Sequence, residues 1–150
     1  MRLVPIWILG AALVAGCEKP RAPEARYIPM PGAVERPFSA AVRVGPMLYL
    51  SGQLGTDSTG KVVPGGIGPE TRQALENIRR LLEANGSSLD RVVKCTAMLA
   101  DIREWADMNQ VYVTYFPTHR PARSAFGTSG LALGGRVELE CMATTAAAGS

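Results

Sequence analysis

Residues 69–100, PETRQALENIRRLLEANGSSLDRVVKCTAMLA, contain the pattern of a helix followed by the pattern of a strand. In the first part, side chains suited to burial recur at helical spacing, which predicts one buried face. These residues are Thr71, Ala74, Leu75, Ile78, Leu81 and Leu82. We expect the helix to begin near Pro69, because proline is favoured at the first helical position, and to end at Gly86. The alternating run from Arg91 to Ala100 then predicts a strand.

Two strand-like runs and a loop come before this helix. The runs from Phe38 to Val44 and from Met47 to Gln53 are joined at Gly45-Pro46, which predicts a hairpin. The segment from Asp57 to Gly68 is rich in Gly, Ser and Pro, which predicts a loop.

A second helix and two more strands follow the central strand. Asp101 and Glu104 resemble a capping box that begins the helix, and Pro117 ends it. One face of this helix would carry Trp105, Met108, Tyr112 and Tyr115, which we expect in the core or in an interface. The runs from Ser124 to Thr128 and from Arg136 to Ala143 are expected to pair with each other.

The element order β-β-α-β-α-β-β predicts an α+β fold, a sheet with two helices on one face. With 150 residues, of which 47% are hydrophobic, the chain is expected to form one domain with a real core. The uncovered face of the sheet would still carry Leu, Val and Met side chains. That surface indicates an oligomer.

The N-terminus is typical of a bacterial lipoprotein. Residues 1–16 fit a signal peptide, and Leu13-Val14-Ala15-Gly16-Cys17 resembles a lipobox, in which Cys17 carries the lipid. An ordinary export signal or a buried apolar helix with an incidental cysteine is the alternative. We expect a Pro-rich linker at 17–37, the folded domain at 38–145 and a disordered tail at 146–150. The chain would then be anchored in the bacterial envelope and face the periplasm.

Cys95 and Cys141 both lie in apolar strand-like runs. An oxidising envelope allows a disulfide between them. We nevertheless expect two buried free thiols, because buried cysteine commonly acts as a small hydrophobic residue.

Several kinds of chemistry are disfavoured by composition. His119 is the single histidine and lies in a predicted loop, and there is no CxxC motif, so neither a Ser-His-Asp triad nor a metal site is expected. The net charge of +3 comes without a long Lys/Arg run, so no nucleic-acid partner is expected.

Arg123 and Glu138 form the strongest candidate pair. Arg123 opens a predicted strand, and its guanidinium offers a planar fork for a carboxylate. Glu138 and Glu140 share one face of an otherwise apolar strand, where a partly buried acid can activate water. By spacing alone, a cross-strand ion pair on a solvated face is the alternative.

Five short motifs occur in an order that resembles the RidA/YjgF family of enamine/imine deaminases. They are Ser51-Gly52-Gln53, Arg72-Gln73-Ala74-Leu75-Glu76-Asn77-Ile78, Asn109 with Tyr112, Pro121-Ala122-Arg123-Ser124 and Val137-Glu138-Leu139-Glu140. The resemblance covers about residues 37 to 145.

This resemblance implies a chorismate-mutase-like fold that assembles as a homotrimer with clefts between subunits. It implies that Arg123 binds the substrate carboxylate and that Glu138 orients the hydrolytic water. Ser51 and Gly52 would form the pocket wall, and Asn109 would lie near the cleft. The implied reaction turns a 2-aminoacrylate-like enamine or imine into a 2-keto acid and ammonia, without a cofactor or metal.

The sequence departs from the family pattern at three places. Phe38 stands where many members have tyrosine, Ala125 stands where some have cysteine, and the segment between Phe116 and Arg123 is short, which would reshape the rim. A small-carboxylate-binding envelope lipoprotein without catalysis is therefore the alternative function. A ribonuclease is disfavoured, because no stripe of aromatic and basic residues is present to stack single strands.

Overall fold

The structure, a computed structural model, describes residues 22–30, 32 and 36–146. Within these ranges the strands are β1 (Ala25–Ile28), β2 (Ala41–Val44), β3 (Met47–Leu50), β4 (Gln53–Leu54), β5 (Val92–Leu99), β6 (Ala122–Gly127) and β7 (Val137–Thr144). The α-helices are α1 (Ile67–Glu83) and α2 (Trp105–Tyr112). Short 3-10 turns lie at Leu89–Arg91, Ile102–Glu104, Val113–Tyr115 and Ala132–Gly134. The predicted signal peptide and Cys17 lie outside the described residues.

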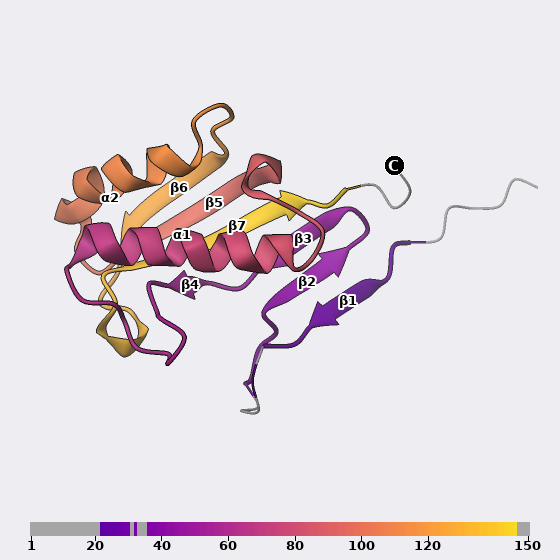
Figure 1. The fold of residues 1–150 in the computed structure, drawn as a ribbon, viewed down its shortest axis with the longest axis horizontal. Helices are drawn as coiled ribbons and strands as arrows, with labels where there is room; N and C mark the ends of the chain where they lie inside the picture. Colours follow the sequence, from indigo (N-terminus) through magenta and orange to yellow (C-terminus); the bar gives the residue numbers. More distant parts are fainter. Residues whose placement is uncertain (1–21, 31, 33–35, 147–150) are drawn as a thin grey trace, which may run out of the picture.

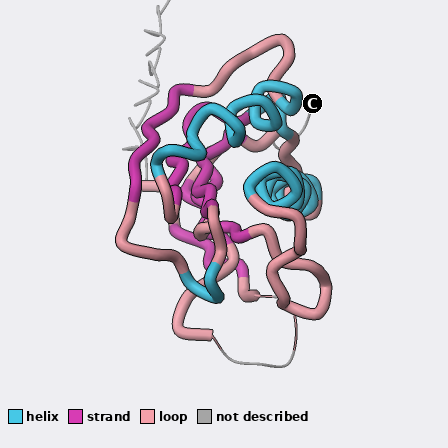
Figure 2. The backbone as a smooth tube through the Cα atoms, turned by 90° about the vertical axis from the view of Figure 1, so that its left-hand side faces the viewer, coloured by secondary structure: helices cyan, strands magenta, loops and turns pink. Residues whose placement is uncertain are grey.

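The strands form one sheet in the order β1-β2-β3-β7-β5-β6, and the short β4 pairs with β7. Neighbouring strands are antiparallel except β5 and β6, which are parallel. Both α-helices lie on the same side of the sheet, as the two views in Figures 1 and 2 show. The predicted α+β architecture and its element order are therefore confirmed, with β1 and β4 as additions. No helix in the described ranges is both long and apolar enough to cross a membrane.

The core lies between α1 and the sheet. Most of the predicted buried face of α1 is confirmed, since Thr71, Ala74, Leu75, Ile78 and Leu82 are all 0% exposed, whereas Leu81 is only partly buried at the edge of the core. The helix begins at Ile67, two residues before Pro69. Proline is tolerated there because the N–H groups of the first turn have no partner within the helix. Gly86 has a φ of +74°, so it ends the helix in the left-handed conformation as predicted.

The predicted pairing of the last two strands is wrong. β7 lies between β3 and β5, and β6 pairs in parallel with β5 instead. The connection from β5 to β6 contains α2, and such a helical crossover returns the chain to start a parallel neighbour. Side-chain alternation identifies the two faces of a strand but not its neighbours, which explains the error.

The sheet extends into the range predicted as linker. β1 pairs with β2 from Ala25 opposite Val44 to Ile28 opposite Ala41. Only Ile28 of this strand is partly buried, so its side chains give almost no hydrophobic pattern. Backbone hydrogen bonding to β2 holds β1 in place. The prolines around β1 had led to the prediction of a linker.

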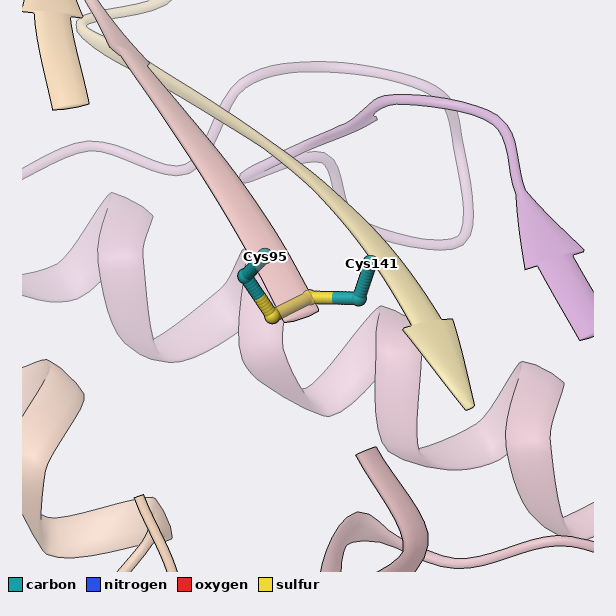
Figure 3. The surroundings of a disulfide bond; sticks show 2 residues. All are labelled: Cys95 and Cys141. Atoms are coloured by element: carbon teal, nitrogen blue, oxygen red, sulfur yellow. A yellow bond between two sulfur atoms is a disulfide. The ribbon is translucent and has the colours of Figure 1, made fainter. Parts of the chain in front are cut away.

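Cys95 and Cys141 form a disulfide, so the expectation of free thiols is wrong (Figure 3). The two residues are directly opposite each other on β5 and β7, and both are buried. This contact follows from the strand order, which the sequence pattern does not reveal. The bond links residues 46 positions apart.

The capping box of the second helix is half confirmed. The Asp101 carboxylate accepts the Arg103 backbone N–H at 2.9 Å, as an N-cap should. The Glu104 carboxylate does not accept a hydrogen bond from the Asp101 backbone N–H, as a complete capping box would require. It accepts hydrogen bonds from the Arg136 guanidinium instead.

Candidate active site

Arg123 lies on the face of the sheet that the helices cover. Its partner in the β5–β6 register is Cys95, which is 0% exposed in the core. Residues opposite each other on neighbouring strands share a face, so Arg123 projects toward α2. Its guanidinium carbon is 4.5 Å from the centroid of the Tyr112 ring and 5.8 Å from that of the Trp105 ring. Two aromatic faces therefore hold this cation.

No ion pair in the described part of the chain includes Arg123. An aromatic ring contacts the flat face of a guanidinium, whereas a carboxylate binds the N–H groups at its edge. The two cation–π contacts therefore hold Arg123 while no acidic side chain of the described residues pairs with its N–H groups.

The Arg123 side chain lines a pocket of about 290 Å³, which we call the arginine pocket. It is lined by Asn109, Tyr112, Val113, Phe116, Arg120, Pro121 and Arg123. The structure thus brings the predicted residues Asn109 and Arg123 together. Ala125 follows Arg123 on the same face of β6 and packs partly against the core.

Glu138 lies on the opposite face of the sheet. Its neighbours Val137 and Leu139 are 0% exposed, so alternation along β7 directs Glu138 to the face without helices, as predicted. The carboxylate is half-buried. Burial chiefly, and the nearby Glu140 charge in addition, raise its pKa above the ordinary value of 4.5.

Gly52 packs directly against the Glu138 carboxylate. A Cβ atom at Gly52 would lie 2.8 Å from the Glu138 carboxyl carbon and closer still to Oε1, so a side chain does not fit there. The Ser51 hydroxyl donates to the Ser39 carbonyl at 2.6 Å, which fastens the segment that follows the exposed Phe38. We call Ser51, Gly52 and Glu138 the glutamate cluster.

The two halves of the predicted site do not meet within one protomer. Arg123 is opposite Cys95, which is opposite Cys141, three residues from Glu138 along β7. Two strand spacings across and three residues along place them roughly 10 Å apart in each direction, and on opposite faces. The alternative of a cross-strand Arg123–Glu138 ion pair is excluded by this arrangement.

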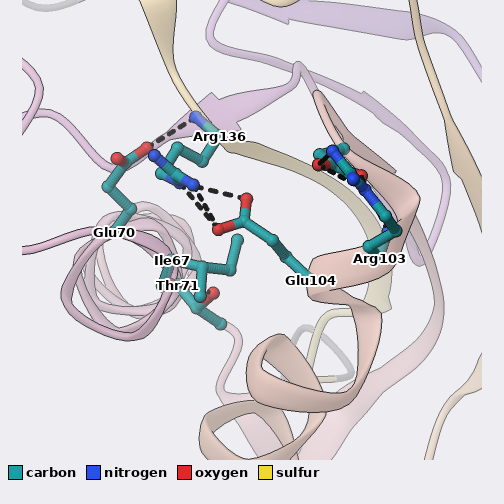
Figure 4. A network of polar contacts seen from close by, with 7 residues as sticks. Ile67, Glu70, Thr71, Arg103, Glu104 and Arg136 are labelled. Carbon is teal, nitrogen blue, oxygen red and sulfur yellow. Dashed lines mark hydrogen bonds and ion pairs between the residues drawn. The ribbon is translucent and has the colours of Figure 1, made fainter.

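A network of polar contacts holds Arg136, which directly precedes β7 and is two residues before Glu138 (Figure 4). Glu70 is 4% exposed and accepts the Arg136 backbone N–H at 2.7 Å. The Arg136 Nε donates to the Glu104 carboxylate oxygens at 2.9 and 3.0 Å. α1 and the turn before α2 therefore both position the strand that carries Glu138.

Sequence reasoning missed the role of two residues in the arginine pocket. Tyr112 was expected only in the core or an interface, and it is indeed buried, with 5% of its surface exposed. Its ring also makes a cation–π contact with Arg123, which was not expected. Burial raises the pKa of Tyr112 to about 12, although the Arg123 charge acts in the other direction. Its hydroxyl has no hydrogen-bond partner among the described residues. Arg120 had no signal of its own, since its loop showed no pattern.

Known proteins resemble this chain along most of the folded part. The family described as Endoribonuclease L-PSP matches residues 30–145. A 2-iminobutanoate/2-iminopropanoate deaminase from Bos taurus is 47% identical over 108 residues, which cover 71% of this chain and 79% of that protein.

Two crystal structures share the fold. The yeast protein YEO7 superposes with a TM-score of 0.75 at 40% identity, covering 81% of this chain and 99% of that one. YyfA from Yersinia pestis, described as a protein of unknown function of the conserved Rid family, has a TM-score of 0.75 at 35% identity, with 81% and 100% coverage.

Proposed function

This chain belongs to the RidA/YjgF/L-PSP family, and we propose that it hydrolyses small reactive 2-imino acids, and the enamines that tautomerise to them, to 2-keto acids and ammonia. The observation that carries this proposal is Arg123. It is a cation without an acidic partner in the described part of the chain, held by two aromatic rings at the wall of a pocket. Such a group suits a substrate that carries a carboxylate.

In the proposed reaction, the substrate carboxylate binds the edge of the Arg123 guanidinium. This places the imine carbon beside a water molecule held by Glu138. The water oxygen bonds to the imine carbon, while the electron pair of the C=N bond and a proton go to nitrogen. The hydroxyl proton of the resulting carbinolamine then passes to nitrogen, the C–N bond breaks to release ammonia, and the keto group forms.

We infer that each site needs two copies of the chain. A neighbouring copy would bring its glutamate cluster to the arginine pocket, since one protomer separates them. The face that carries Glu138 has apolar side chains available for such contact, because Tyr49 is 40% exposed and Phe126 is 47% exposed. A homotrimer, which the family resemblance implies, would supply three such sites.

The test uses the full chain in detergent and 2-iminopropanoate formed in situ from D-alanine by an amino-acid oxidase. Semicarbazide traps the free imine, so a slower formation of the semicarbazone measures enzymatic hydrolysis. We expect Arg123→Ala to lose about a hundredfold or more in kcat/KM. Arg26→Gln, an exposed charge on β1 at the opposite edge of the sheet from β6, serves as the control. Full activity of Arg123→Ala would refute the proposal, and binding without turnover would favour the alternative carboxylate-binding protein.

We also propose that the domain is exported and anchored through a lipid on Cys17. The lipobox-like run before Cys17 supports this, and the Cys95–Cys141 disulfide suits an oxidising compartment. We expect Cys17→Ser to abolish labelling with radioactive palmitate and to release the protein from the membrane fraction. Unchanged membrane association of this variant would contradict the anchor.

A further inference from the structure

The arginine pocket contains a second cation, Arg120, in addition to the arginine assigned to the substrate carboxylate. Arg120 is exposed at the rim, and it forms no ion pair with any of the described residues. The other lining residues are Asn109, Tyr112, Val113, Phe116 and Pro121. None of these carries a negative charge, so the lining itself does not compensate either guanidinium.

Two cations in one pocket whose own lining has no acid favour a ligand with two negative charges, since the Glu138 that a neighbouring copy would bring is assigned to the hydrolytic water. Val113, Phe116 and Pro121 give the pocket an apolar wall, and charges act more strongly beside such a wall than in open water. Like charges at short range also repel, and this repulsion is relieved when anionic groups bind both of them. A monocarboxylate would satisfy Arg123 and leave Arg120 without a partner.

Arg120 and Arg123 are three residues apart in the chain and line the same pocket of about 290 Å³. Three residues span at most roughly 10 Å, so Arg120 and Arg123 can contact opposite ends of one short ligand. Pro121 restricts the backbone between them. The segment from Phe116 to Arg123 is short, which keeps Arg120 near the pocket instead of on a longer loop.

We propose that Arg120 is a specificity-determining residue that binds a second substrate carboxylate. The preferred substrates are then 2-imino dicarboxylic acids of four or five carbons, the imines of acidic amino acids. This inference rests on the proposed function and narrows its substrate class. Water adds to C2 and ammonia leaves as in the general reaction, so the product is a 2-keto dicarboxylate. Oxidation of the amine of an acidic amino acid, or elimination from one with a substituent on its β-carbon, is the class of reaction that would supply such imines.

The experiment compares 2-iminosuccinate, formed in situ from D-aspartate by D-aspartate oxidase, with 2-iminopropanoate. The full chain, Arg120→Gln, Arg120→Lys and the control Arg26→Gln are measured with both imines. We expect the wild-type chain to prefer the dicarboxylate. Arg120→Gln should lower the ratio of kcat/KM for the two imines by about five- to tenfold, mainly through KM. Arg120→Lys should retain part of the preference, and added salt should weaken the dicarboxylate reaction more than the other.

Calorimetry with the keto acids separates this inference from the proposed function. Oxaloacetate should bind more tightly than pyruvate to the wild-type chain, and this difference should shrink in Arg120→Gln, whether or not turnover is seen. Turnover of 2-iminopropanoate with an unchanged substrate ratio in Arg120→Gln would overturn the inference and leave the deaminase intact. Failure of both imines to react would overturn the deaminase, and equal binding of the two keto acids would overturn the role of Arg120.

Discussion

Glu138 occupies the space that a side chain at position 52 would need, and Gly52 is the residue found there. The carboxyl carbon of Glu138 lies 2.8 Å from where a Cβ of residue 52 would be. The position of this carboxylate on the uncovered face is therefore determined by a backbone contact from the segment between β3 and β4.

Gly52→Ala should displace the Glu138 carboxylate and lower kcat by about tenfold or more, because small errors in the position of a catalytic group are costly. Gly68→Ala is the matched control. A Cβ there meets only Val111 at 3.9 Å, and alanine favours the helix. Steady-state kinetics and urea unfolding of both variants measure the effect. If Gly52→Ala keeps the kcat of the wild-type chain, the position of the Glu138 carboxylate does not limit the reaction.

Tyr112 is expected to act on Arg123 through its ring and not through its hydroxyl. Tyr112→Phe removes a buried hydroxyl without a partner, so stability should stay equal or rise by up to about 1 kcal/mol. Tyr112→Leu removes the cation–π contact, and KM for the imino acid should rise about three- to tenfold with a smaller change in kcat. Equal KM values for the two variants would exclude a role of the ring.

The raised pKa of Glu138 predicts two opposite pH effects. The folded state holds this proton more tightly than the unfolded state, so from 4.5 upward stability falls as pH rises toward the folded pKa, and then levels off. Activity should do the reverse, since the ionised carboxylate is needed, and kcat/KM should fall as the solution is acidified through a pKa above 4.5.

Glu138→Gln is the variant that checks this assignment. Urea midpoints measured across pH 4 to 7 should lose the Glu138 contribution to the slope in Glu138→Gln, and the residual activity should lose its acidic limb. If the pH profiles of the two proteins superimpose, another group is responsible.

Mixed oligomers test whether two copies share each site. Arg123→Ala and Glu138→Gln should each have strongly reduced activity alone. Coexpressed, they should recover about a third of the activity in mixed trimers, because each trimer that contains both variants has one site of three with both an intact arginine and an intact glutamate. Recovery is measured on oligomers purified through a different tag on each variant. A complete lack of recovery in verified mixed oligomers would contradict the shared site.

The disulfide between β5 and β7 should contribute several kcal/mol to stability. For a closed loop of this length, chain entropy gives about 4 kcal/mol, with 2–5 typical of native disulfides. Urea unfolding of the Cys95→Ala/Cys141→Ala double variant against the oxidised wild type measures the loss. Alkylation of the unfolded, unreduced wild type should modify neither residue. Modification of both cysteines would show that the bond is absent.

Much of the fold could be predicted from local pattern, and part of it could not. The buried face of α1, the end of that helix at Gly86 and the hairpin of β2 and β3 all follow from spacing within a few residues. β1 was missed because its side chains are mostly exposed and only its backbone pairs. The candidate residues Arg123 and Glu138 could be named from residue type, but the aromatic support of Arg123 could not.

The sequence by itself determined the order of the elements and which residues of each face inward, because these properties depend on side-chain period within one segment. Only the tertiary structure decided that β7 lies between β3 and β5, that Cys95 meets Cys141, and that Arg123 and Glu138 lie on opposite faces. The period of a strand distinguishes its two faces. Which strands are neighbours, and which faces they share, depends on packing between segments far apart in the chain.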